Sequence, residues 1–175
     1  MRSTGIVRRI DELGRVVIPK EIRRTMKIRE GEELEVFTTE NNSLILKKYS
    51  AVNELERLAT EYTEAVSKST GYTAVITDAD KVVAVSGDIR IFKQGDSLSY
   101  KGEKLIQERK PRLLNGKNVI AVIGEDTANI GGIALHPIIK AGDVMGAVIL
   151  FSSKELNDLA LMLAQTAASF FAAQA

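Results

Sequence analysis

The most informative stretch of this 175-residue chain is TGIVRRIDELGRVVIPKEIRR, which spans residues 4–24. Residues 4–10 are rich in β-branched side chains and predict a β-strand. Residues 11–14, Asp-Glu-Leu-Gly, predict a turn in which Gly14 supplies a positive φ. Residues 15–18 predict a second strand, so the stretch begins with a β-hairpin.

A short helix and a second hairpin follow. Pro19 suits the first position of a helix, where its missing N–H is not needed, and residues 20–27 form the predicted helix of barely two turns. Residues 33–39 and 44–48 predict two strands around a turn at residues 40–43. Two hairpins and one short helix make too small a core for a stable monomer of about 50 residues, so we expect this part of the chain to dimerise.

Positive charge is concentrated at the start of the chain. Residues 1–29 contain nine lysines and arginines against three acidic residues, whereas residues 51–175 contain thirteen against fifteen. The cations of the predicted helix share one face, opposite Ile22 and Met26. Guanidinium groups match phosphates and guanine edges, so the pattern favours nucleic-acid binding over a merely solvated basic face. The candidate DNA-binding residues are Arg8, Arg9 and Arg15 of the hairpin and Lys20, Arg23, Arg24 and Lys27 of the helix.

The stretch at residues 4–24 resembles the N-terminal domain of the AbrB family of transition-state regulators, and the similarity continues without gaps to about Lys48. This resemblance implies a swapped-hairpin β-barrel, in which two chains interleave their hairpins and the intertwined dimer binds double-stranded DNA. It also implies DNA contacts for Arg8, Arg15, Arg23 and Arg24. Relatives that carry a C-terminal GAF-like domain regulate sporulation genes, which implies the same role here.

A helix over residues 50–70 is the predicted junction between a domain at residues 1–50 and a second domain at residues 51–175. Its apolar residues are spaced alternately three and four apart, which is a heptad seam. Gly71 closes the helix as a C-cap. The seam residues proposed for oligomerisation are Val52, Leu55, Ala59, Tyr62 and Val66.

The rest of the second domain predicts a sheet followed by a last helix. Ser152 and Glu155 form a capping-box signature at the start of this helix, which is apolar on most sides and must therefore be covered on most sides. Its seam residues, proposed to join two dimers into a homotetramer, are Leu156, Leu159, Leu163 and Phe170. The predicted strands cover residues 72–77, 82–86, 119–123, 132–139 and 144–151, with a short helix at residues 102–109.

Residues 137–148, PIIKAGDVMGAV, resemble the hairpin near the end of GAF domains, and the order helix, sheet, helix is also theirs. We therefore expect an α+β protein, with a swapped-hairpin barrel followed by a GAF-like α/β sandwich with flanking helices. GAF domains often enclose a small-molecule pocket, which implies a small-molecule effector. A vestigial pocket that serves only assembly is the alternative, and no motif assigns pocket residues.

Composition excludes several other classes of site. The chain has no cysteine and a single histidine, His136, so disulfides, thiolate metal sites and multi-histidine sites within one chain are excluded. No catalytic constellation, metal site or cofactor is predicted, and His136 is interpreted as structural or pocket-lining. The longest stretch without formal charge, residues 159–175, is too short to span a membrane. With no apolar N-terminal run, we expect a cytoplasmic protein associated with the nucleoid.

The leading hypothesis is a homo-oligomeric DNA-binding transcription regulator. One alternative is an antitoxin-type DNA-binding autorepressor with a toxin partner, since antitoxins also use the AbrB-like fold. Their C-terminal segments are typically disordered, whereas residues 51–175 carry the patterning of a folded domain. Another alternative is an enzyme with a DNA-binding appendage, which the missing catalytic constellation disfavours.

Overall fold

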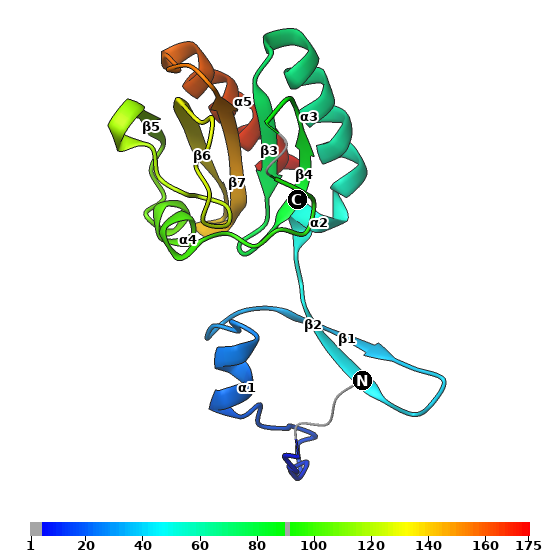
Figure 1. Cartoon of the computed structure of the whole chain (residues 1–175). Helices are drawn as coiled ribbons and strands as arrows, with labels where there is room; N and C mark the ends of the chain where they lie inside the picture. The colour runs from blue at the N-terminus through cyan, green and yellow to red at the C-terminus, as the bar shows by residue number, and fades with distance from the viewer. Residues whose placement is uncertain (1–4, 90–91) are drawn as a thin grey trace. The chain divides into compact units, whose positions relative to one another are not determined.

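The computed structural model describes residues 5–89 and 92–175. The chain divides into two compact units, Met1–Tyr49 and Ser50–Ala175 (Figure 1). Each unit has its own helices and strands.

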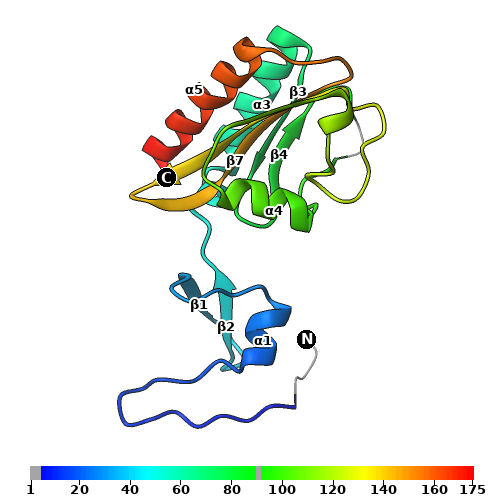
Figure 2. The same cartoon turned by 90° about the vertical axis from the view of Figure 1, so that its left-hand side faces the viewer.

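The first unit begins with an extended hairpin (Figure 2). Its turn is closed by hydrogen bonds between the backbones of Asp11 and Arg15 and from Gly14 to Asp11, and Gly14 has the predicted positive φ of 77°. Residues 5–18 nevertheless form no strand, so the two strands predicted over residues 4–10 and 15–18 are wrong for a single chain; Thr4 lies outside the described residues. An extended segment becomes a strand only when a neighbour completes its ladder of hydrogen bonds.

Helix α1 (Lys20–Thr25) and the hairpin of β1 (Leu34–Thr38) and β2 (Leu44–Lys48) complete this unit. The helix is shorter than predicted because Lys27 has a φ of 53° and leaves the helical path. The N–H of Ile28 then donates to the Arg23 carbonyl, and that of Lys27 to the Arg24 carbonyl. This is a Schellman ending with lysine where glycine is usual.

The second unit is an antiparallel sheet between two layers of helix and loop. The strand order is β4-β3-β7-β6-β5. Strand β7 lies at the centre of the sheet, with β6 beside it. In chain order the elements are α2 (Ala51–Glu54), α3 (Glu56–Thr70), β3 (Thr73–Thr77), β4 (Val82–Ser86), α4 (Tyr100–Gln107), β5 (Arg112–Asn115), a 3-10 turn (Gly116–Asn118), β6 (Gly132–Lys140), β7 (Asp143–Ser152) and α5 (Asp158–Gln174).

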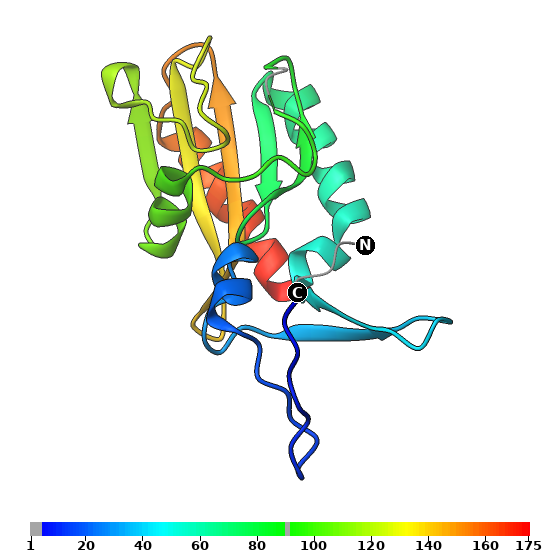
Figure 3. The same ribbon diagram turned by 60° about the horizontal axis from the view of Figure 1, so that its bottom comes forward.

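Helices α3 and α5 lie on one face of the sheet and α4 on the other (Figures 2 and 3). Alternate residues of the strands enter two separate cores, as the period of two requires. In β3, Ile76 packs toward the layer of α3 and α5, whereas Val75 packs toward α4. The central strands are therefore apolar on both faces.

Three sequence predictions about this unit need correction. The predicted helix over residues 50–70 is interrupted at Leu55, although it ends as predicted at Gly71, which is left-handed with a φ of 73°. The predicted strand at residues 119–123 contains only an isolated bridge, Leu98 to Ile123, and β5 lies before it. The last helix is capped by the Asn157 side chain, not by the predicted capping box.

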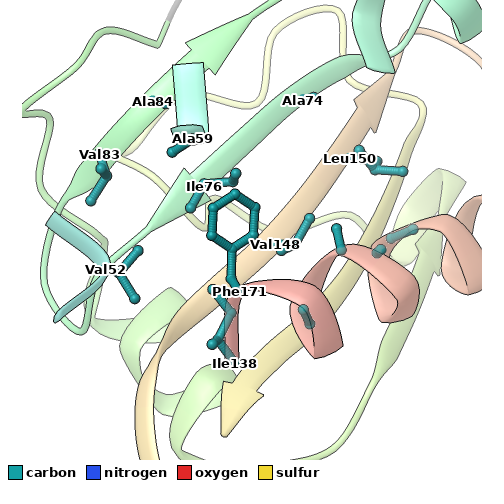
Figure 4. Packing of buried hydrophobic residues seen from close by; sticks show 14 of the residues in the cluster. Val52, Ala59, Ala74, Ile76, Val83, Ala84, Ile138, Val148, Leu150 and Phe171 are labelled. Carbon is teal, nitrogen blue, oxygen red and sulfur yellow. The ribbon is translucent and has the colours of Figure 1, made fainter. Parts of the chain in front are cut away.

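Helix α5 packs on the sheet with its alanines. Ala160, Ala164, Ala167 and Ala168 are buried against the sheet. Phe171 is buried with them (Figure 4). Alanine allows the helix backbone to approach the strands closely. Two residues of the predicted seam face outward, Leu159 with 59% exposure and Phe170 with 39%.

Candidate nucleic-acid interface

The cations of α1 project from a helix that buries none of its residues. Lys20, Arg23 and Arg24 are exposed. In the part of the chain that the structure describes, neither arginine forms an ion pair. The guanidinium groups are therefore available to an anionic partner.

Arg15 is held by the turn of the first hairpin. Its Nε lies 2.7 Å from Oδ2 of Asp11, while its backbone N–H donates to Oδ1 of the same carboxylate at 2.8 Å. The N–H of Leu13 also donates to that Oδ1, at 3.0 Å. The backbone hydrogen bond from Arg15 and the bond from its guanidinium hold the pKa of Asp11 below its ordinary value, so this carboxyl is ionised at neutral pH.

The other hairpin arginines, Arg8 and Arg9, are exposed, and an Nη1–H of Arg8 donates to the Val7 carbonyl at 3.2 Å. Lys27 does not extend the cationic face of α1 as predicted, because it follows the end of the helix. Its carbonyl accepts a hydrogen bond from Nζ of Lys48 at 3.3 Å, which ties the helix end to β2.

One exposed cation of this unit lies outside the predicted set and contacts an aromatic ring. Lys47 in β2 is exposed, and its Nζ lies 4.6 Å from the centre of the Phe37 ring on the neighbouring strand. This is a cation–π contact. Only the pairing of the strands places Lys47 near Phe37, so no local pattern could have identified it.

The sheet face beneath α4 is occupied by the chain's own side chains. Phe92 packs on Phe151 with ring centres 4.6 Å apart, and Ile106 of α4 is fully buried there. His136 is half-buried in β6 with Nδ1 2.9 Å from the Pro137 carbonyl oxygen. Within residues 5–89 and 92–175, no three His, Asp or Glu side chains gather as a metal ion would require.

Comparison with known proteins identifies the family. The family model described as "Stage V sporulation protein T C-terminal, transcription factor" matches residues 54–175. Stage V sporulation protein T of Bacillus subtilis is 40% identical over 175 residues, with 99% of this chain and 98% of that protein covered. The chain belongs to the stage V sporulation protein T family.

The N-terminal unit of this family member also resembles proteins that match it alone. The transition state regulatory protein AbrB of Bacillus subtilis is 59% identical over 49 residues, which are 28% of this chain and 50% of that protein. A family model described as "Antidote-toxin recognition MazE, bacterial antitoxin" matches residues 7–53. Because residues 51–175 fold and match a transcription-factor family, the antitoxin alternative is not favoured.

The C-terminal unit of this stage V sporulation protein T family member has the predicted GAF fold. The GAF domain of an Acinetobacter phosphoenolpyruvate-protein phosphotransferase superposes with a TM-score of 0.56 at 13% identity, covering 73% of this chain and 83% of that domain. At such a low sequence identity, the superposition shows a shared fold and nothing about function. Among the helices in the described part of the chain, none combines the length and apolar character that crossing a membrane requires.

The predicted oligomerisation residues fall into two groups in this family member. Val52, Ala59 and Leu156 are buried in the chain's own core, so these three cannot supply the partner contacts predicted for them. Leu159 and Phe170 lie on the exposed side of α5. The remaining predicted residues, Leu55, Tyr62, Val66 and Leu163, pack partly against the core.

Proposed function

We propose that this sporulation transcription factor binds double-stranded DNA through the arginines of its first unit. The observation that carries the proposal is the exposed cluster of Lys20, Arg23 and Arg24 on α1. With six residues, α1 is about 9 Å long at 1.5 Å per residue. A helix this short does not suit the recognition role of a helix-turn-helix motif, so hairpin arginines are expected to share the contact with it.

Arg15→Ala and Arg24→Ala should each weaken binding to duplex DNA by roughly 5- to 100-fold, because a well-placed arginine contact is worth that much. The measurement is fluorescence anisotropy at several salt concentrations. The slope of log affinity against log salt should be about −0.9 per phosphate neutralised. Arg57→Ala is the matched control, since Arg57 is exposed on α3 and pairs with Glu61. Two folded variants with unchanged affinity would refute the assignment.

We propose that the first units of two chains form the intertwined dimer. The support is a concentration of exposed apolar side chains in residues 5–18, where Val7 is 85% exposed and Leu13 75% exposed. Such a patch in a protein marks an interaction site. Residues 5–18 form no strand within one chain, and a second hairpin beside them would allow a β-ladder to form.

A fragment of residues 1–50 should therefore sediment as a folded dimer at micromolar concentration, with no folded monomer species. The reason is that one chain buries too little apolar surface to stabilise about 50 residues. Asn41→Asp is the control, because this residue is exposed in the turn between β1 and β2 and should leave the dimer unchanged. A stable folded monomer would show that the interleaved arrangement is unnecessary.

We propose that the C-terminal units join two such dimers into a tetramer through the exposed side of α5. Leu159, Met162 and Phe170 present a stripe of apolar surface there. Two DNA-binding dimers on one particle gain avidity through their effective concentration, without any new contact to DNA. We expect the assembly to act in the cytoplasm at the nucleoid, and we propose no catalytic role for it.

A further inference from the structure

The Asp11 carboxylate accepts three hydrogen bonds at the turn of the first hairpin. Its Oδ1 accepts two backbone N–H groups, from Leu13 and Arg15, and its Oδ2 accepts Nε–H of the Arg15 guanidinium. One carboxylate thus fixes both the backbone of the turn and the direction of the side chain that leaves it.

The contact between Arg15 and Asp11 uses the Nε–H of the guanidinium group. A guanidinium has five N–H donors, and the bond through Nε leaves the four donors of Nη1 and Nη2 for another partner. The Arg15 side chain is 73% exposed, so these donors are open to solvent. They form the fork that binds a phosphate or a guanine edge in two parallel hydrogen bonds.

We propose that Asp11 is a positioning residue for DNA recognition. By binding Nε–H, it orients the Nη1 and Nη2 donors of Arg15 toward the DNA sequence that the protein recognises. The inference rests on the proposed contact of Arg15 with DNA. A pre-aimed side chain loses less conformational freedom on binding. The benefit is largest for directional hydrogen bonds at a specific site, whereas non-specific attraction depends mainly on net charge.

Variants of Asp11 and its neighbour Glu12 separate the orientation of Arg15 from the effect of net charge on DNA affinity. Asp11→Asn retains an oxygen for the N–H groups of Leu13 and Arg15 but removes the anion that holds the guanidinium. Glu12→Gln makes the same change of charge one residue away, at an exposed side chain. Both full-length variants are titrated with a duplex selected by the intact protein from a random-sequence pool, and with a scrambled duplex of the same composition.

Glu12→Gln should bind both duplexes as tightly as the intact protein or more tightly, because it removes a negative charge. Asp11→Asn should match it on the scrambled duplex but bind the selected duplex about fivefold more weakly than the intact protein, near the lower limit of a directed base contact. If Asp11→Asn matches Glu12→Gln on both duplexes, Asp11 contributes only charge and the proposal is overturned.

A double variant tests whether Asp11 acts through Arg15. In an Arg15→Ala background, Asp11→Asn should no longer weaken binding to the selected duplex, because there is no guanidinium left to aim. A loss that persists in this background would mean that Asp11 supports the turn alone, which overturns the proposal. If Arg15→Ala by itself leaves the selected duplex bound as before, the proposed contact of Arg15 has failed instead.

Discussion

Leu159→Asp combined with Phe170→Asp is expected to convert the proposed tetramer into dimers. Neither side chain belongs to the buried alanine face of α5. The Phe170 ring also meets those of Tyr62 and Phe171, so circular dichroism is used to check that the variant stays folded. In the assembled protein, each α5 would bring two carboxylates into an apolar contact. Burying an unpaired charge is strongly unfavourable, and the contact should open.

Light scattering on the full-length protein measures the mass directly. Tyr100→Asp combined with Gln107→Asp is the matched control, because it adds the same charges at exposed positions of α4, on the opposite face of the sheet. The control should remain tetrameric. If the intact protein is only a dimer, or if the α5 variant stays tetrameric, another surface builds the assembly.

Phe171→Ala is expected to lower the free energy of unfolding of the C-terminal unit by about 3–5 kcal/mol. Phe171 is fully buried and lies among residues of α2, β3, β6 and β7 (Figure 4). Its ring also meets Tyr62 of α3 edge-on, with ring centres 5.6 Å apart. Truncation would remove these contacts and leave a cavity between the helices and the sheet.

The measurement is urea denaturation followed by circular dichroism. Tyr100→Ala is the control, since Tyr100 is 81% exposed and its loss should change stability by no more than about 0.5 kcal/mol. An equal decrease in the free energy of unfolding for the two variants would mean that Phe171 does not stabilise the core. The comparison separates burial from the mere removal of an aromatic ring.

Local features of the fold were predictable wherever neighbouring residues decide them. Strands β2 and β4 have the predicted bounds, because a run of strand-forming residues flanked by turn residues needs no distant information. Gly71 ends α3 for a similarly local reason, since it adopts the left-handed conformation with little strain. The break at Leu55 was not predictable, because the heptad pattern continues through it.

The candidate DNA-binding residues were found in the sequence because cations cannot be buried cheaply in so small a unit. Arg23 and Arg24 are exposed on α1 as their spacing suggested. Lys27 departs from that face because the Schellman ending places it beyond the last turn. The bond from Arg15 to Asp11 joins residues four apart, and the hairpin turn brings their side chains together.

Helix α5 marks the limit of sequence reasoning. Its sequence shows a helix that is apolar on several sides. Periodicity assigned the leucine and phenylalanine seam to contact between subunits, but it did not tell which face the chain's own sheet covers. The folded chain buries the alanine face, because small side chains let α5 lie close to β6 and β7 while Phe171 fills the space beside α3. Periodicity reports that an apolar face exists, but the choice among several faces depends on the shape of the surface that receives it. Sequence alone was therefore sufficient for the elements, the basic surface and the family resemblance, and the folded chain was needed to tell which apolar residues belong to the core and which remain outside.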